Sequence, residues 1–282
     1  MNTIRVRAVA YASAAIVPFM ALTAAPSAFA TSSSAYGFEA GFTEQKTRTG
    51  LGPIAAVSGS APPAFSRTAD ITNYQRTVAI EAGSGPIPSL FVTIPSVKTH
   101  AASAGIGVDS ESAEGDVTVK GITVALMLNP PPPVATPAKS PIEPEPYLNI
   151  SATKISSGAS ISQVFPQPAK TSTSAKFTGL VIFGSLVGNQ TIKFTGNVPN
   201  NTVLFQSPTV TITANNQIIA GLISCTPKCV FSPVSVTGAA LEISLTDAVI
   251  DGKKVSGTVT IGQSQAGSGG LITTPSAFAS GR

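Results

Sequence analysis

The chain has 282 residues, and only 11% of them are charged, against about a quarter in an average soluble domain. Its formal net charge is +4, and its basic runs are no longer than pairs such as Lys253–Lys254, which argues against binding of DNA or RNA. With two cysteines and one histidine, a zinc site lacks ligands unless carboxylates contribute. We therefore expect no catalytic, cofactor or metal site.

Residues 1–30 are expected to form a secretion signal. Arg5 and Arg7 precede an apolar run, and the A-x-A motif of Ala28 and Ala30 marks a cleavage site. A membrane anchor is the alternative, but the apolar core is short for a bilayer and the cleavage motif follows at once. No later stretch reaches the roughly 20 apolar residues that a transmembrane span needs. We expect a secreted or cell-surface protein without such a span.

Period-two alternation of apolar residues predicts strands in the first half of the chain, at 35–42, 77–82, 89–97 and 117–128. A Gly/Pro-rich connection is expected around residues 52–63. The polar stretch Asp109–Asp116 is interpreted as a turn.

A proline-rich segment at 129–147 interrupts the strand pattern, with eight prolines between Pro130 and Pro146. Proline lacks the amide donor that sheets and helices need. The sequence leaves two domain organisations open. The segment is an excursion from one β-rich domain of residues 31–265, or it separates two β domains at 35–128 and 148–265.

In the second half, a Ser/Thr/Pro-rich loop is expected at 156–174 and a flexible tail at 266–282. Asp251-Gly252, between the apolar runs 236–250 and 255–261, is the strongest hairpin signal, because both turn positions favour positive φ. Further strands are expected at 148–160, 177–187, 191–195, 203–205, 209–214 and 217–224.

Short Thr/Val/Ile runs separated by frequent turns predict an all-β protein, an antiparallel β-sandwich or a barrel-like fold. A β-solenoid or prism-like fold is the alternative, although no fixed repeat period is present. We expect no substantial helix after residue 30.

Cys225 and Cys229 are predicted to form a disulfide that pins one turn, since an exported pair around Pro-Lys can close a small loop. Redox or metal chemistry is the alternative. Redox pairs, however, favour C-x-x-C spacing, which these residues lack.

Two polar features are candidates for chemistry. A hydrolase triad could use His100 with a serine and Asp109 or Asp116, although the chain has no G-x-S-x-G motif. Asp109, Glu111, Glu114 and Asp116 lie close in sequence, and we interpret them as a solvated turn, with weak calcium binding as the alternative.

Aromatic residues give little support to sugar binding. The chain has no tryptophan, and after residue 30 its tyrosines are Tyr36, Tyr74 and Tyr147. A carbohydrate-binding module would need a groove lined by Tyr74 or Tyr147.

Several short motifs resemble the bacterial choice-of-anchor P family. They are Ala35-Tyr36-Gly37 after the signal, the runs 196–203 and 210–217, and the run 236–241 together with 261–266. Ala214-Asn215 departs from the family pattern, and the proline-rich segment looks like an insertion. The resemblance implies an exported β-rich protein of unknown activity, with varying C-terminal sorting signals or none. It favours one domain.

The sequence thus predicts an exported cell-surface or extracellular β protein, without enzymatic activity, in a structural, adhesive or matrix-associated role. Its expected partners are cell-envelope or matrix components. An extracellular hydrolase and a carbohydrate-binding module remain as alternatives.

Overall fold

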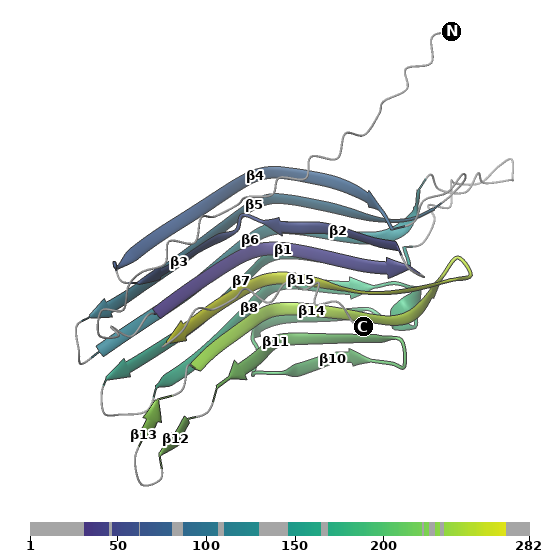
Figure 1. Cartoon of the computed structure of the whole chain (residues 1–282). Helices are drawn as coiled ribbons and strands as arrows, with labels where there is room; N and C mark the ends of the chain where they lie inside the picture. The colour runs from purple at the N-terminus through teal and green to yellow at the C-terminus, as the bar shows by residue number, and fades with distance from the viewer. Residues whose placement is uncertain are drawn as a thin grey trace, which may run out of the picture.

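The described part of the computed structural model comprises residues 31–44, 47–61, 63–80, 87–106, 110–129, 146–164, 169–221, 223–225, 229–231 and 234–268. These residues form two antiparallel sheets that lie face to face (Figure 1). Sheet A has the order β10 (Thr202–Gln206), β11 (Val210–Ala220), β14 (Val234–Ile250), β15 (Lys253–Ser268), β1 (Thr31–Glu44), β2 (Thr47–Ile54), and β3 (Val57–Ala61) also pairs with β1.

Sheet B follows the chain in order: β4 (Phe65–Ala79), β5 (Ile87–Ile106), β6 (Ser110–Asn129), β7 (Leu148–Val164), β8 (Lys170–Phe183), β9 (Ile192–Asn197). β12 (Ile223–Cys225) and β13 (Cys229–Phe231) form a separate small hairpin. In the described part of the chain the helical content is one 3₁₀ turn, η1 (Ser185–Val187).

The expected all-β sandwich is confirmed. β1 lies over β5 and β6, β15 over β6 and β7, and β14 over β7 and β8, so the strands of the two sheets run in nearly the same direction. The sheets do not close into a barrel within the described residues. The structure contains, over those residues, no helix long and apolar enough to cross a membrane.

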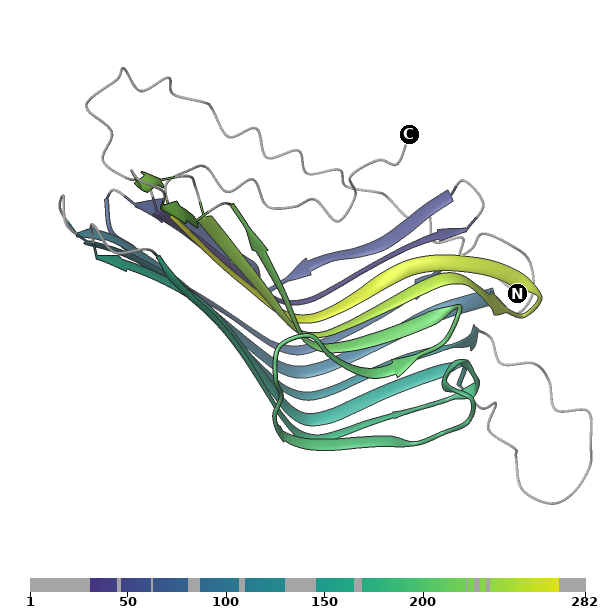
Figure 2. The same cartoon turned by 90° about the horizontal axis from the view of Figure 1, so that it is seen from below.

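Both sheets bend at mid-length, with sheet A on the inner side of the bend and sheet B on the outer side (Figure 2). A mid-strand residue with positive φ departs from the extended backbone conformation and so turns its strand. Such residues lie at the middle of strands in both sheets: Asn73 (φ 55°), Gly121 (69°) and Gly179 (60°) in sheet B, and Asn215 (50°) and Gly262 (67°) in sheet A. The bend therefore occurs at Gly and Asn residues, the residue types that adopt positive φ most readily.

The core differs on the two sides of the bend. Large apolar side chains fill one arm and the bend itself, among them Phe38, Phe42, Leu90, Ile94, Val124, Leu126, Ile150, Phe177 and Ile243. The other arm is filled by small residues, such as Ala101, Ser103, Ala113, Ala159, Ser264 and Ala266. We call this second part the small-residue arm. It runs from the bend to the strand ends at Thr31, Ile106, Ser110, Val164 and Ser268.

The two sheets approach each other closely in the small-residue arm. A Cβ atom on Gly115 of β6 would lie 2.6 Å from the carbonyl oxygen of Ser34 and 3.1 Å from that of Gln265, both in sheet A. Side-chain hydroxyls replace apolar bulk here: Ser33 donates a hydrogen bond to the carbonyl oxygen of Ala102 at 2.9 Å. Thr31 and Ser103 also share a hydrogen bond between the sheets. The arm is thus held by backbone proximity, by hydroxyl contacts and by a small apolar cluster that includes Ile161, Val234 and Val236.

The predicted Asp251-Gly252 hairpin is confirmed. β14 and β15 pair up to Ile250 and Lys253, and both turn residues have positive φ, 52° and 76°. The strand predicted at 117–128 lies inside β6, whose neighbour across the proline-rich segment is β7 in the same sheet. Residues 130–145 of that segment lie outside the described part of the chain.

Three expected loops are wrong. Of the predicted turn 109–116, residues from Ser110 onward belong to β6; residues 156–174 belong mostly to β7 and β8; and β2 and β3 occupy most of the expected Gly/Pro-rich connection. The physical reason is the same for the first two. The inward positions of these two stretches hold mainly small or polar residues, such as Glu111, Ala113, Gly115, Ser157 and Ala159, with Ile161 as a large apolar exception, so they lack the Val/Ile alternation that marks a half-buried strand. At the C-terminus, β15 extends to Ser268, inside the expected tail.

Candidate functional site

A polar cluster lies on the outer face of sheet B in the small-residue arm. The strand register places Thr68, His100, Asp116, Gly158 and Ser174 in one row across β4 to β8. Glu114 precedes Asp116 by two residues on β6. Since side chains alternate between faces along a strand, Glu114 and Asp116 point to the same side.

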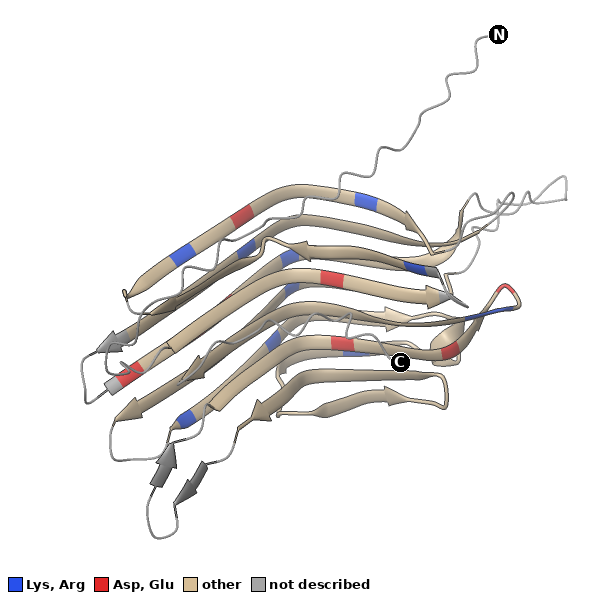
Figure 3. Cartoon of the chain, in the orientation of Figure 1, with Lys and Arg blue, Asp and Glu red and all other residues tan. Residues whose placement is uncertain are grey.

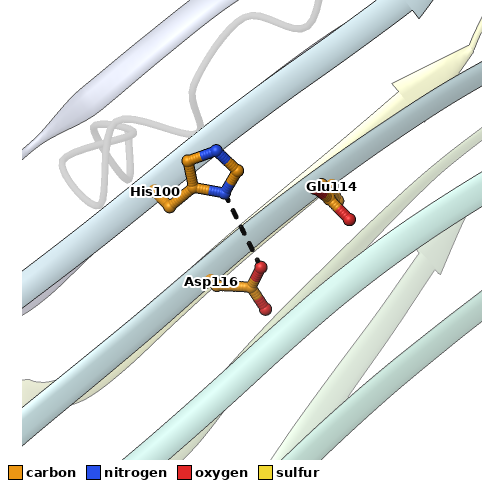
Figure 4. A group of neighbouring side chains, drawn as sticks. All are labelled: His100, Glu114 and Asp116. Atoms are coloured by element: carbon orange, nitrogen blue, oxygen red, sulfur yellow. Dashed lines mark ion pairs between the residues drawn. The ribbon is translucent and has the colours of Figure 1, made fainter. Parts of the chain in front are cut away.

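Three of these side chains converge. The Nδ1 atom of His100 lies 3.8 Å from Oδ2 of Asp116, and one ligand-type atom from each of His100, Glu114 and Asp116 lies within 4.8 Å of the other two (Figure 4). On the other side of the ring, Nε2 of His100 lies 3.0 Å from the hydroxyl oxygen of Ser66. Both ring nitrogens of the histidine therefore face a polar partner.

The cluster is open to solvent. His100 is 29% exposed and Asp116 59% exposed at their side chains. An open surface pocket adjoins it, lined by residues of β4 to β7 that include Ser66, Glu114 and Ser160 together with the apolar Phe65 and Ile161. A ligand at the cluster would therefore be held on a surface and only partly enclosed.

Desolvation raises the pKa of Asp116 above its ordinary value, and the neighbouring Glu114 carboxylate raises it further, while His100 lowers it. Gly158 provides the room for this carboxylate. A Cβ atom at residue 158 would lie 2.7 Å from Oδ1 of Asp116. The Asp116 side chain thus leans over the glycine of the next strand.

Two chemistries match this arrangement. In the first, Ser66, His100 and Asp116 act as nucleophile, base and orienting acid. That order requires the Nδ1 proton to face Asp116 and Nε2 to accept from Ser66. In the second, Nε2–H donates to Ser66, and the free Nδ1 lone pair faces Asp116 and Glu114, which is the arrangement of a metal-binding histidine. The two alternatives differ only in the imidazole tautomer.

A second polar group lies on the outer face of sheet A. The Tyr36 hydroxyl donates to Oε1 of Gln263 at 2.7 Å, and the amide of Asn216 donates to Oε2 of Glu242 at 2.9 Å. Burial raises the pKa of Tyr36 strongly, with further contributions from Glu39 and Glu242. This group joins four neighbouring strands on the inner side of the bend.

The sequence predictions for the acidic stretch are corrected in part. Glu111 lies three residues before Glu114, so the two point to opposite faces of β6, and Glu111 is buried between the sheets. Glu114 and Asp116 lie on a strand, where a solvated turn was expected. Asp109 lies outside the described residues. His100, a candidate for a hydrolase triad with Asp109 or Asp116, lies beside Asp116, and Ser66 is the serine at its other ring nitrogen.

The other predicted residues are placed as follows. Cys225 and Cys229 are backbone partners in the register of the β12–β13 hairpin, and their side chains lie outside the described part, so the disulfide stays a prediction. The cleavage residues Ala28 and Ala30 also lie outside it. The rings of Tyr74 and Tyr147 pack partly buried against the main core.

No protein-family model matches the chain, and no curated protein matches it either. The resemblance to the choice-of-anchor P family therefore stays a prediction, and the functional argument depends on the fold and on the surfaces that the described residues form.

Proposed function

We propose that this chain is an exported cell-surface or extracellular β protein that acts through its surfaces, in a structural, adhesive or matrix-associated role. The observation that carries the proposal is the outer face of sheet B in the small-residue arm. Across β4 to β8 this face presents a field of hydroxyl side chains: Ser66, Thr68, Ser112, Thr118, Ser156, Ser160, Ser162, Ser172 and Ser174.

Such a face suits contact with a hydroxyl-rich polymer or envelope surface. Hydroxyls both donate and accept hydrogen bonds, and they carry little rotamer entropy to lose on contact. Near the bend the same face also carries lysines of four neighbouring strands: Lys120 and Lys154 are register partners, and Lys98 and Lys176 lie one row further along, so hydroxyls and a positive row are presented together (Figure 3). The small residues also leave the face flat, which permits contact over a wide area.

The test is association of residues 31–282 with isolated cell envelopes, measured by co-sedimentation over a range of protein concentrations. The double variant Ser160→Glu/Ser172→Glu places two charges on cross-strand partners that share a 2.8 Å hydrogen bond on this face. The matched control, Thr211→Glu/Ser244→Glu, changes a cross-strand pair of sheet A.

We expect at least a tenfold weaker association for the sheet B variant and an unchanged one for the control. Equal losses in both variants, or no association of the unmodified protein, would contradict the proposal. Fractionation of the native host into medium, envelope and cytoplasm checks export independently, since a cytoplasmic location excludes it.

A hydrolase is the second candidate, because Ser66, His100 and Asp116 are in line. The separation of 3.8 Å between His100 and Asp116 exceeds a hydrogen bond, and the group lies on an open sheet face. Labelling by a fluorophosphonate that is lost in Ser66→Ala would favour this function. A carbohydrate-binding module is weakened, since Tyr74 and Tyr147 pack against the core and so do not present open platforms.

A further inference from the structure

We propose that His100, Glu114 and Asp116 form a binding site for a divalent transition-metal ion of the zinc type, with Ser66 as the residue that fixes the histidine tautomer. This inference goes beyond the proposed function, which requires no ion. The site lies on the outer face of sheet B, in the small-residue arm.

The donor set selects the class of ion. The three side chains offer one imidazole nitrogen and carboxylate oxygens from two acids. Imidazole suits zinc, copper, nickel and iron, whereas calcium and magnesium prefer sites made wholly of oxygen ligands. Three protein ligands leave further coordination positions for water or for a partner, as in open zinc sites.

The spacing is close to what such an ion needs. Tetrahedral ligands at about 2.0–2.1 Å from zinc lie roughly 3.4 Å apart. The pair Nδ1 of His100 and Oδ2 of Asp116 lies at 3.8 Å, and all three ligand atoms lie within 4.8 Å. The backbone positions are fixed by the β5–β6 ladder, in which His100 and Asp116 are register partners. Small rotations of the exposed carboxylates therefore suffice to close the site.

Ser66 gives the histidine the right protonation pattern. A metal-binding imidazole commonly donates its other N–H to a hydrogen-bond acceptor, which orients the ring and leaves one lone pair for the ion. The Ser66 hydroxyl oxygen lies 3.0 Å from Nε2, and Nδ1 is the nitrogen that faces the acids. The positions of Ser66 and the acids thus suit the tautomer with its proton on Nε2, which leaves the Nδ1 lone pair for the ion.

Charge supports the same conclusion. Within the described residues, neither Glu114 nor Asp116 forms an ion pair with a lysine or arginine; the contact of Asp116 with His100 is an ion pair only when the imidazole is protonated. Two carboxylates on one face of a strand repel each other. A bound dication would remove this repulsion, whereas a proton can neutralise only one of them.

The experiment is calorimetric titration of tag-free residues 31–282 with ZnCl₂ and, separately, with CaCl₂. A histidine tag is omitted because His100 is the only histidine in the chain. The Cys225→Ser/Cys229→Ser background removes the two thiols that could also bind zinc. The ligand variants are His100→Ala, Glu114→Gln and Asp116→Asn. The control is Asp70→Asn, an exposed acid of β4 opposite Lys98.

We expect one zinc ion per chain, a Kd at least tenfold weaker in each ligand variant, no change in Asp70→Asn and much weaker binding of calcium. Ser66→Ala should weaken zinc binding by about tenfold, the low end of the range for such outer partners. In NMR spectra, zinc should shift the single histidine signal. Circular dichroism checks that each variant is folded.

The proposal is overturned if the unmodified site binds no zinc stoichiometrically, or if His100→Ala binds it as tightly as the parent protein. Calcium binding equal to that of zinc would also overturn it, since it would assign the acids to a site that does not use the histidine. Envelope association is measured separately, so the two proposals can fail independently.

Discussion

The hydroxyl of Ser157 in β7 donates a hydrogen bond of 2.6 Å to the carbonyl oxygen of Gly262 in β15, so the two sheets are joined at the positive-φ residue where sheet A bends. Ser157 is buried, and Gly262 has a φ of 67°. Neither β1 nor β14 has a register partner opposite Gly262, and the Ser157 hydroxyl supplies a partner for its carbonyl oxygen.

Removal of this hydroxyl should destabilise the protein. Ser157→Ala leaves the Gly262 carbonyl unpaired in a buried position, which costs about 1–3 kcal/mol of unfolding free energy. Urea unfolding followed by circular dichroism measures the change. Ser160→Ala is the control, because Ser160 is on the same strand but on the outer face, where we expect a change below about 0.5 kcal/mol. Equal losses of unfolding free energy in Ser157→Ala and Ser160→Ala would contradict a stabilising role of the inter-sheet hydrogen bond.

The close approach of the sheets at Gly115 gives a second prediction. In Gly115→Ala the new methyl group would lie 2.6 Å from the backbone oxygen of Ser34, so one backbone has to move. We expect a loss of about 1–3 kcal/mol, typical of overpacking. Gly52→Ala is the control, since a Cβ atom there has no neighbour within 4 Å. An unchanged melting temperature for Gly115→Ala would contradict the close contact in the small-residue arm.

Much of the fold could be predicted from the sequence, and particular residues show where the prediction stopped. Asp251-Gly252 and the strand 117–128 have the turn chemistry and the alternation that local rules detect. The start of β6 lacks this apolar alternation, because its inward positions are Glu111, Ala113 and Gly115. Its strand character comes from pairing on both sides with β5 and β7, which is a tertiary effect.

The polar cluster could be predicted only in part. His100 and Asp116 were each candidates, but their meeting depends on the register of β5 and β6. From Thr99 opposite Val117 to Ile106 opposite Ser110 the register is constant, so one correctly placed pair would have put His100 opposite Asp116. Ser66 comes from β4, and one serine among many carries no sequence signal that it will lie beside a histidine.

The buried carboxyl of Glu111 predicts a pH effect. Burial raises the pKa of Glu111 above its ordinary 4.5, the hydrogen bond from Ser268 opposes this, and Oε2 has no partner among the described residues. The folded state therefore binds more protons than the unfolded state between the two pKa values, so the free energy of unfolding falls as pH rises through that window. Above the higher of the two pKa values, burial of the ionised Glu111 carboxylate lowers the free energy of unfolding by its full amount.

Glu111→Gln should accordingly raise the melting temperature at pH 7, and the gain should shrink toward zero below pH 4.5, where the wild-type carboxyl is protonated in both states. Thermal unfolding at a series of pH values measures this difference. Asp70→Asn should show no comparable gain at pH 7, since Asp70 is exposed. A Glu111→Gln variant that is less stable at pH 7 than at pH 4, relative to wild type, would reverse the assigned sign.

Gly158 allows the metal proposal to be tested without removing a ligand. In Gly158→Ala the methyl group would lie 2.7 Å from Oδ1 of Asp116, and the carboxylate is the far end of a movable side chain. The backbone need not shift, so we expect a stability change below about 1 kcal/mol. The carboxylate, however, has to turn away from its place over residue 158, and zinc affinity should fall by roughly tenfold, as for other changes in ligand orientation. Calorimetry and urea unfolding of the same samples separate the two effects. Unchanged zinc affinity would show that Asp116 binds from another rotamer, and a large loss of stability would show that the glycine serves the sheet itself.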